Sequence, residues 1–278
     1  MRISLSSTAI IVALTTLSLA GCAAVTPPST GAEHVTAITA HVHGIVASPD
    51  DNGYLLGTHD GVYPVSARGQ LGARVGPSFD AMALTAVGRN LLASGHPGSE
   101  IPPGWGSPNL GIMSSSDVGR TWEPTAFVGD KDFHSLAADL DGTVYGLATD
   151  SIDVLTSTDA GATWAPTGGS LFAFSLAVDA TGRILASTPD GLKVSGDGGV
   201  SFALMAEAPL LYQLSTSPNR QLLVGVDNKE RIWVAAAGDD LWRESGRVHG
   251  MAQAIAITDA GDLLVIDDSG ITALPVNR

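Results

Sequence analysis

The chain has one cysteine, few basic residues and no apolar run long enough to span a bilayer. Because Cys22 stands alone, no disulfide can form within the chain. Lys and Arg total 14 against 28 Asp and Glu, which gives a formal net charge of −14. Proteins that bind nucleic acid or acidic lipid need basic patches. This composition favours neither, so we expect no nucleic-acid partner.

The sequence beyond residue 33 also lacks a long amphipathic helical period. Short alternating apolar runs are separated by turns rich in Gly, Asp and Asn, and the chain holds 33 glycines. Short, evenly spaced strands with turn chemistry between them indicate an all-β repeat architecture. Residues 34–278, about 245 in number, are enough for one large all-β domain.

The start of the chain resembles a bacterial lipoprotein signal peptide covering residues 1–21. Arg2 provides the positive start, and the mostly apolar run 10–19 is too short for a stable membrane-spanning helix. Leu-Ala-Gly-Cys at 19–22 resembles a lipobox, which implies cleavage before Cys22 and a lipid on its sulfur. Residues 22–33 would then form the lipidated tether of a protein on the extracytoplasmic face of the cell membrane. An ordinary secretory signal with a stray cysteine is the alternative.

An octad with the pattern S-x-D-x-G-x-T-W recurs in the middle of the chain. Its copies begin at residues 115, 157 and 195, and the third copy ends in Phe. Asp accepts hydrogen bonds from its own turn, Gly supplies the positive φ of a reversal, and the final aromatic ring can be buried. A period near 40 residues indicates a solenoid or a propeller. The residues that carry the pattern are Ser115, Asp117, Gly119, Trp122, Ser157, Asp159, Gly161, Trp164, Ser195, Asp197, Gly199 and Phe202.

This octad resembles the Asp-box, also called the BNR repeat. The chain is similar to bacterial Asp-box propellers, a group that overlaps glycosyl hydrolases such as sialidases, sortilin-type ectodomains and photosystem II assembly-factor-like propellers. The resemblance implies that the octads are outer turns between strands, remote from any central site. Their role would then be to maintain the fold.

Six units of similar pattern follow the tether. Their second strands are expected at residues 54–58, 90–94, 144–148, 184–188, 222–226 and 263–267. Four strands in about 40 residues match one propeller blade, so we predict a six-bladed β-propeller over residues 34–278. The last unit has room for three strands, and we expect residues 34–39 to add its outer strand and close the ring. Alternatively, residues 34–40 extend the tether.

Polar residues gather at one end of the aligned strands, the end where propellers commonly bind ligands. The first strands align His43, Asp80, His134, Phe174, Tyr212 and Gln253, and the ends of the second strands add His59 and His96. We predict a ligand site formed by His43, Asp80, His96, His134 and Tyr212. Trp105 lies in a Pro/Gly-rich insertion at 97–111 and either stacks on a ligand or pins the loop.

Two interpretations of the histidines stay open. In the first, His43, His59, His96 and His134 bind a transition metal, copper or zinc, since imidazole suits both ions. His41 would share a strand face with His43. In the second, the histidines are rim residues that hydrogen-bond to backbone groups and turn ends.

The resemblance also raises glycoside hydrolysis, which needs two positioned carboxyl groups. Sialidases combine a tyrosine nucleophile with an acid and an arginine triad, and the sequence shows no recognisable triad. Asp80, Glu100 and Asp150 could supply a carboxyl pair. We expect a non-catalytic module that binds a ligand, metal, glycan or protein at the channel mouth. A glycoside hydrolase is the alternative, and no catalytic residue is assigned.

Overall fold

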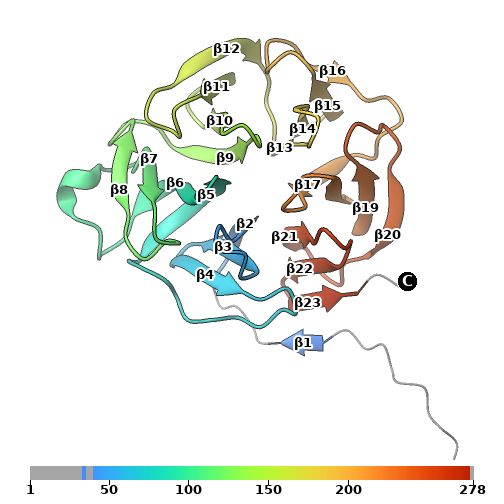
Figure 1. Cartoon of the computed structure of the whole chain (residues 1–278), viewed down its shortest axis with the longest axis horizontal. Coiled ribbons are helices and arrows are strands. Elements are labelled where there is room, and N and C mark those ends of the chain that lie inside the picture. The colour runs from blue at the N-terminus through green and yellow to red at the C-terminus, as the bar shows by residue number, and fades with distance from the viewer. Residues whose placement is uncertain (1–32, 36–39, 276–278) are drawn as a thin grey trace, which may run out of the picture. The chain divides into compact units, whose positions relative to one another are not determined.

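The computed structural model describes residues 33–35 and 40–275. The expected signal peptide, the lipidation site Cys22 and the tether up to residue 32 lie outside these residues. The described chain forms six antiparallel sheets arranged as blades around a central axis (Figure 1). This arrangement confirms the six-bladed β-propeller. No helix among residues 33–35 and 40–275 has the length and apolar character needed to cross a membrane.

The strands of the first three blades follow the chain in order. Blade one has β2 (Val42–Ala47), β3 (Tyr54–Thr58) and β4 (Gly61–Val65). Blade two has β5 (Phe79–Val87), β6 (Asn90–Pro97), β7 (Ile112–Ser115) and β8 (Glu123–Ala126), with a 3-10 turn η1 (Pro103–Trp105) in its long loop. Blade three has β9 (Phe133–Ala138), β10 (Val144–Ala148), β11 (Asp153–Ser157) and β12 (Ala165–Ser170).

The remaining blades repeat this order. Blade four has β13 (Ser175–Val178), β14 (Ile184–Thr188), β15 (Gly191–Ser195) and β16 (Ala203–Leu204). Blade five has β17 (Leu211–Thr216), β18 (Leu222–Asp227), β19 (Arg231–Ala236) and β20 (Arg243–Arg247). Blade six has β21 (Ala252–Ile257), β22 (Leu263–Asp267) and β23 (Gly270–Leu274). All six predicted second strands are present.

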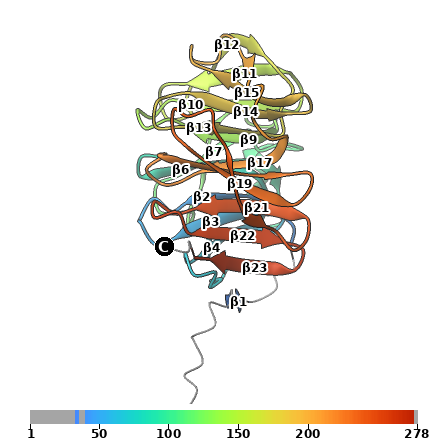
Figure 2. The same cartoon turned by 90° about the vertical axis from the view of Figure 1, so that its right-hand side faces the viewer.

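The N-terminal segment closes the ring. Strand β1 (Glu33–Val35) pairs antiparallel with β23, with Glu33 opposite Ala273, and so becomes the outer strand of blade six. Figures 1 and 2 both show β1 beside β23. The predicted closure is confirmed for residues 34 and 35, while residues 36–39 lie outside the described part of the chain.

Blade one departs from the predicted four strands. Within the described chain its sheet has three, and the segment that follows makes only two isolated bridges, Val62 to Val75 and Val65 to Leu71. Gly76, with φ at 70°, lies against the first octad, where an added Cβ would be 2.2 Å from the carbonyl oxygen of Gly119. Gly69, earlier in this segment, lies against Ile271 of blade six. The segment therefore runs as an irregular strap from blade six along blade one to the octad of blade two.

The hydrophobic core lies between blades. Six buried clusters occur, and each combines residues of two adjacent blades. Leu55 of blade one packs with Phe79 of blade two, for example, and Ile266 of blade six packs with Leu56 of blade one. Each sheet thus buries both faces against its neighbours, and a fully buried Leu or Phe contributes about 1.5–3 kcal/mol.

The three octads fold as nearly identical turns between the third and fourth strands of blades two, three and four. In the second copy the Ser157 hydroxyl donates to Asp159 at 2.8 Å and accepts from the Gly161 N–H at 2.9 Å. Asp159 also accepts from the N–H and the hydroxyl of Thr163, at 2.8 and 2.6 Å. The indole of Trp164 donates to the Gly161 carbonyl at 2.9 Å. The sequence pattern therefore encodes a closed hydrogen-bond network.

The second octad predicts a specific acid sensitivity. Hydrogen bonds from the hydroxyl and N–H of Thr163 and from Ser157 lower the pKa of Asp159 to about 2. A carboxyl group with a lowered pKa in the folded state stabilises that state above its ordinary pKa of 3.8, and the contribution disappears as pH falls through about 2. Asp159→Asn should lower the urea midpoint at pH 7 and have little effect near pH 2.

The exposed Asp190, which belongs to no octad, is the control for this comparison. Asp190→Asn should leave the urea midpoint almost unchanged at both pH values. An equal loss of stability in Asp159→Asn at pH 7 and pH 2 would show that the Asp159 charge is not the stabilising element.

Candidate functional site

We call the face of the propeller where the inner strands β2, β5, β9, β13, β17 and β21 begin the mouth. In five of these strands the pairing register shifts by one residue close to this face, as in a β-bulge. A bulge leaves one residue unpaired and re-aims its side chain. The extra residues are His43, Met82, His134, Tyr212 and Gln253.

The predicted alignment of the inner strands is therefore wrong in blade two. Met82 occupies the position equivalent to His43, and Asp80 lies two residues earlier. Strands β5 and β6 have nine and eight residues and extend farther toward the mouth than those of other blades. This extension pairs Asp80 with His96 across the two strands.

A central channel opens at the mouth. It encloses a cavity of about 220 Å³ lined by the inner strands of all six blades. His43 and His134 line it near the mouth, while Ala47 and Arg220 line it toward the opposite face. The octad turns lie at that opposite face, because Ser157 pairs with Val144 at the far end of β10. The candidate site and the repeated turns thus occupy opposite ends of the blades.

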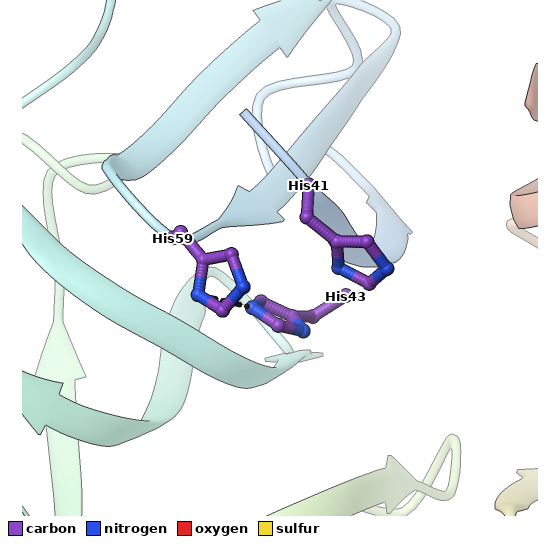
Figure 3. Close-up of side chains that lie close together, drawn as sticks. All are labelled: His41, His43 and His59. Carbon is purple, nitrogen blue, oxygen red and sulfur yellow. Dashed lines mark hydrogen bonds between the residues drawn. The ribbon is translucent and has the colours of Figure 1, made fainter. Parts of the chain in front are cut away.

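Three donor atoms from blades one and two converge at the mouth. His43 Nε2 lies 3.2 Å from His59 Nδ1, and both nitrogens lie 3.0 Å from Asp80 Oδ1. His41 joins them, since one ligand atom from each of the three histidines lies within 4.8 Å of the others. Figure 3 shows the three imidazoles facing one another from the start of β2 and the end of β3. We call His41, His43, His59 and Asp80 the mouth cluster.

The mouth cluster has the dimensions of a metal site. Metal–ligand bonds of 2.0–2.1 Å in a tetrahedral zinc site place neighbouring ligand atoms about 3.3 Å apart. The His43, His59 and Asp80 atoms form a triangle with edges of 3.0, 3.0 and 3.2 Å. Asp80 Oδ1 is buried, and its polar neighbours are these two imidazole nitrogens. A buried carboxylate oxygen in this state is suited to a cation.

The protonation state of His43 also suits a ligand. Burial lowers the pKa of His43 to about 4, and the nearby His59 and His41 act in the same direction, while the Asp80 carboxylate opposes them. His43 is therefore neutral at pH 7 and keeps a lone pair available for a metal.

A close approach of blades one and two places Asp80 beside the histidines. Gly57 on β3 faces the inner strand of blade two, and an added Cβ would lie 2.8 Å from the carbonyl oxygen of Ala81. Only glycine leaves room for the blade-two backbone at this distance. The Leu55-Leu56-Gly57 run of β3 thus contributes to the site as well as to the core.

The predicted ligands His96 and His134 lie farther along the rim. His96 Nδ1 is 3.5 Å from Asp80 Oδ2, and its Nε2 is 3.7 Å from Asp132 Oδ2. His134 Nε2 is 2.7 Å from the same Asp132 oxygen. The structure does not gather His43, His59, His96 and His134 at one point. It places them in a row along the rim. Asp80 lies between the pair His43 and His59 and the next histidine, His96, and Asp132 lies between His96 and His134.

Asp132 contacts the last two histidines of this row, His96 and His134. Burial alone would raise the pKa of Asp132, but hydrogen bonding with His134 and the charges of His134 and His96 lower it overall. Its Oδ1 is buried without a hydrogen-bond partner. Sequence reasoning missed Asp132. It placed His41 on the same strand face as His43 but did not include it among the predicted metal ligands. The Asp-x-His spacing of Asp132 and His134 at the start of β9 is the signal that could have identified the pair.

The predicted ligand residues Tyr212 and Trp105 make structural contacts, and so does Gln253, which the alignment places at the same level. The Tyr212 hydroxyl accepts a hydrogen bond from the N–H of Ala252 in blade six at 3.2 Å. Gln253 likewise accepts from the N–H of Val42 in blade one at 2.8 Å. Trp105 is partly buried against the core cluster between blades one and two, as expected of a ring that pins the insertion.

The carboxyl groups considered for glycoside hydrolysis are mostly engaged elsewhere. Glu100 accepts from Arg74 at 2.9 Å and from the N–H of Ser78 at 3.0 Å. Asp150 forms an ion pair with Lys131 at 2.6 Å. Asp80 belongs to the mouth cluster. These contacts give a glycosidase mechanism no specific support.

Comparisons with known proteins identify the fold. No protein-family model matches the sequence, and no curated protein matches it. Among solved structures, the chain is similar to a candidate gluconolactonase, with a TM-score of 0.67 and 14% identity over 90% of this chain and 93% of the other. It is also similar to a gluconolactonase from Xanthomonas campestris, with a TM-score of 0.66, 12% identity and 86% of each chain covered.

A third similar structure is the extracellular domain of a hybrid two-component system from B. thetaiotaomicron. Its TM-score is 0.57 at 12% identity, over 89% of this chain and 33% of the other. Identities this low show a common fold and leave function to be argued from the site. The chain therefore has the propeller fold found in gluconolactonases and in the extracellular domain of a two-component system.

The contact between Tyr212 and Ala252 predicts a role in stability. Tyr212→Phe removes the acceptor and leaves the N–H of the buried Ala252 unsatisfied. We expect this change to lower the free energy of unfolding by about 1–3 kcal/mol, measured by urea denaturation. Tyr63→Phe is the control, because it removes a hydroxyl from an exposed contact with Asp60. It should lower the free energy of unfolding by less than Tyr212→Phe does. Equal stability of Tyr212→Phe and wild type would contradict the structural role.

Proposed function

We propose that this protein is a metal-binding propeller module. His43, His59 and Asp80 hold one transition-metal ion at the mouth, and His41 is the fourth ligand. The observation that carries the proposal is the triangle formed by two imidazole nitrogens and the buried Asp80 Oδ1, with edges of 3.0–3.2 Å.

The donor set favours zinc or copper. Imidazole nitrogens suit both ions, whereas calcium and magnesium prefer oxygen ligands. The net charge of −14 favours the approach of cations. His96, 3.5 Å from the second oxygen of Asp80, is placed to orient that carboxylate from outside the ligand set.

Metal-assisted hydrolysis is a second candidate function. The observation that favours it is the Asp132–His134 pair, in which a carboxylate 2.7 Å from the imidazole can orient a general base on the same rim. Glucono-lactone and chromogenic glycosides would be offered to the zinc-loaded protein. Turnover by the wild-type protein that is lost in His134→Ala would support hydrolysis. If the wild-type protein turns over none of these substrates, metal binding stays the proposed function.

Metal titration tests the main proposal. The purified protein, stripped with a chelator, should bind about one Zn²⁺ or Cu²⁺ per chain in isothermal titration calorimetry. Bound Co²⁺ should show the visible absorption of a tetrahedral site. His43→Ala and Asp80→Asn should each weaken the affinity by at least about 100-fold, since loss of a ligand costs more than loss of a supporting group.

His249→Ala is the matched control, because His249 is exposed and lies outside the mouth cluster. It should bind metal like the wild type, and so should His134→Ala. Equal weakening in His43→Ala and His249→Ala would point to adventitious histidine binding and overturn the proposal.

We also propose that the module is anchored by lipid on Cys22 at the extracytoplasmic face of the cell membrane. The Leu-Ala-Gly-Cys motif at the end of the apolar run supports this location. Expressed in a bacterium, wild-type protein should sediment with membranes and partition into detergent. Cys22→Ser should shift it to the soluble fraction, because the diacyl anchor is lost. Unchanged sedimentation would contradict lipid anchoring.

A further inference from the structure

A second cavity lies at the mouth, beside the row of histidines. It has a volume of about 500 Å³ and is formed by the loops that follow β10 and precede β13, in blades three and four. Ligand pockets for small molecules have volumes of this order. His134, Ser135 and Phe174 line both this cavity and the central channel, so the two meet along these residues. We call the second cavity the side pocket.

The side pocket presents two exposed aromatic rings. Phe172 is 62% and Phe174 is 49% exposed, and Ile152 beside them is 56% exposed. The two rings meet edge to face, with centroids 5.8 Å apart and an interplanar angle of 81°. A third ring can extend such an arrangement, because offset and edge-to-face contacts are favoured.

The main-chain segment that carries these rings is held by hydrogen bonds. The N–H of Leu171 donates to the carbonyl of Ile152 at 2.9 Å, and the N–H of Phe174 donates to the carbonyl of Ser187 at 2.8 Å. Leu171 is itself buried in the cluster between blades three and four. The segment 171–174 is thus fixed at both ends, and a ligand would bind to a preformed aromatic surface.

The polar edge of the side pocket has paired charges. Asp150 lines the pocket and is neutralised by Lys131 at 2.6 Å. His134 lines it with its Nε2 directed to Asp132 at 2.7 Å. A charged ligand would find no unpaired counter-charge here, and the net charge of −14 opposes an anion further. The pocket's chemistry therefore favours an uncharged ligand.

We propose that the side pocket binds an uncharged aromatic molecule of one or two rings, which packs on Phe172 and Phe174 with its polar end toward His134. The size of the cavity, the preformed ring pair and the paired charges at its edge carry this inference. It is independent of metal in the mouth cluster.

The fluorescent probe N-phenyl-1-naphthylamine, which is aromatic and uncharged, tests the pocket directly. Titrated into the purified, chelator-treated protein, it should bind saturably at one site per chain. Its anionic relative 8-anilinonaphthalene-1-sulfonate should bind more weakly by about tenfold. The double variant Phe172→Ser/Phe174→Ser should lose at least about tenfold in probe affinity, equivalent to 1.4 kcal/mol.

The two rings are largely exposed, so their replacement should leave the thermal unfolding midpoint near that of wild type. Leu204→Ser/Leu241→Ser is the matched control, since these side chains are 56% and 70% exposed and line neither the side pocket nor the central channel. It should keep the probe affinity within about twofold of wild type.

Probe binding that does not saturate, or that survives the phenylalanine replacements, would overturn the proposal. Sedimentation with neutral phosphatidylcholine vesicles that depends on both rings, without saturable probe binding, would also overturn it and identify a membrane-docking surface.

Discussion

The packing of each blade against both neighbours is the constraint on which the rest of the structure depends. Six buried clusters lie at the six blade interfaces, so no blade has a core of its own. An open ring would expose two apolar sheet faces. The interface between blades six and one, where Ile266 packs with Leu56, joins the two ends of the described chain. The pairing of β1 with β23 reinforces that junction by completing the last sheet.

The octad turns and the candidate site lie at opposite ends of the blades. The octad turns close the far ends of the outer strands, where Asp159 and its equivalents satisfy backbone donors. At the mouth the inner strands are irregular, with a bulge in five of six blades. Regular hydrogen bonding at one end holds the fold, while bulges at the other end turn side chains such as His43 and His134 toward the mouth.

The mouth has two chemically different halves. Blades one to three provide the mouth cluster and the Asp132–His134 pair, and blades three and four provide the aromatic side pocket. His134 belongs to both halves, since it pairs with Asp132 and lines the side pocket. A metal ion and an aromatic molecule would then occupy neighbouring positions on one rim. The two proposed sites would then be adjacent, with His134 between them.

Local chemistry in the sequence was sufficient to predict the propeller. The octad turn, the second strands and the three-stranded last unit depend on residues close together in the chain, and all appear in the structure. The outer strand of blade one was predicted wrongly, because the strap that replaces it is shaped by packing of Gly76 on the octad of another blade.

The composition of the mouth cluster was decided by tertiary structure. The sequence identified His43, His59 and Asp80 as mouth residues, but the position of Asp80 depends on the longer β5 and β6 and on the approach of blade two at Gly57. The separation of His96 and His134 from the cluster likewise depends on how strands of different blades pack. The pairing of His134 with Asp132, by contrast, is local, because the two residues are two positions apart in the sequence. Periodicity fixes where a strand lies and which end faces the mouth. Distances of 3 Å between side chains depend on bulges and on contacts between blades, which no single repeat encodes.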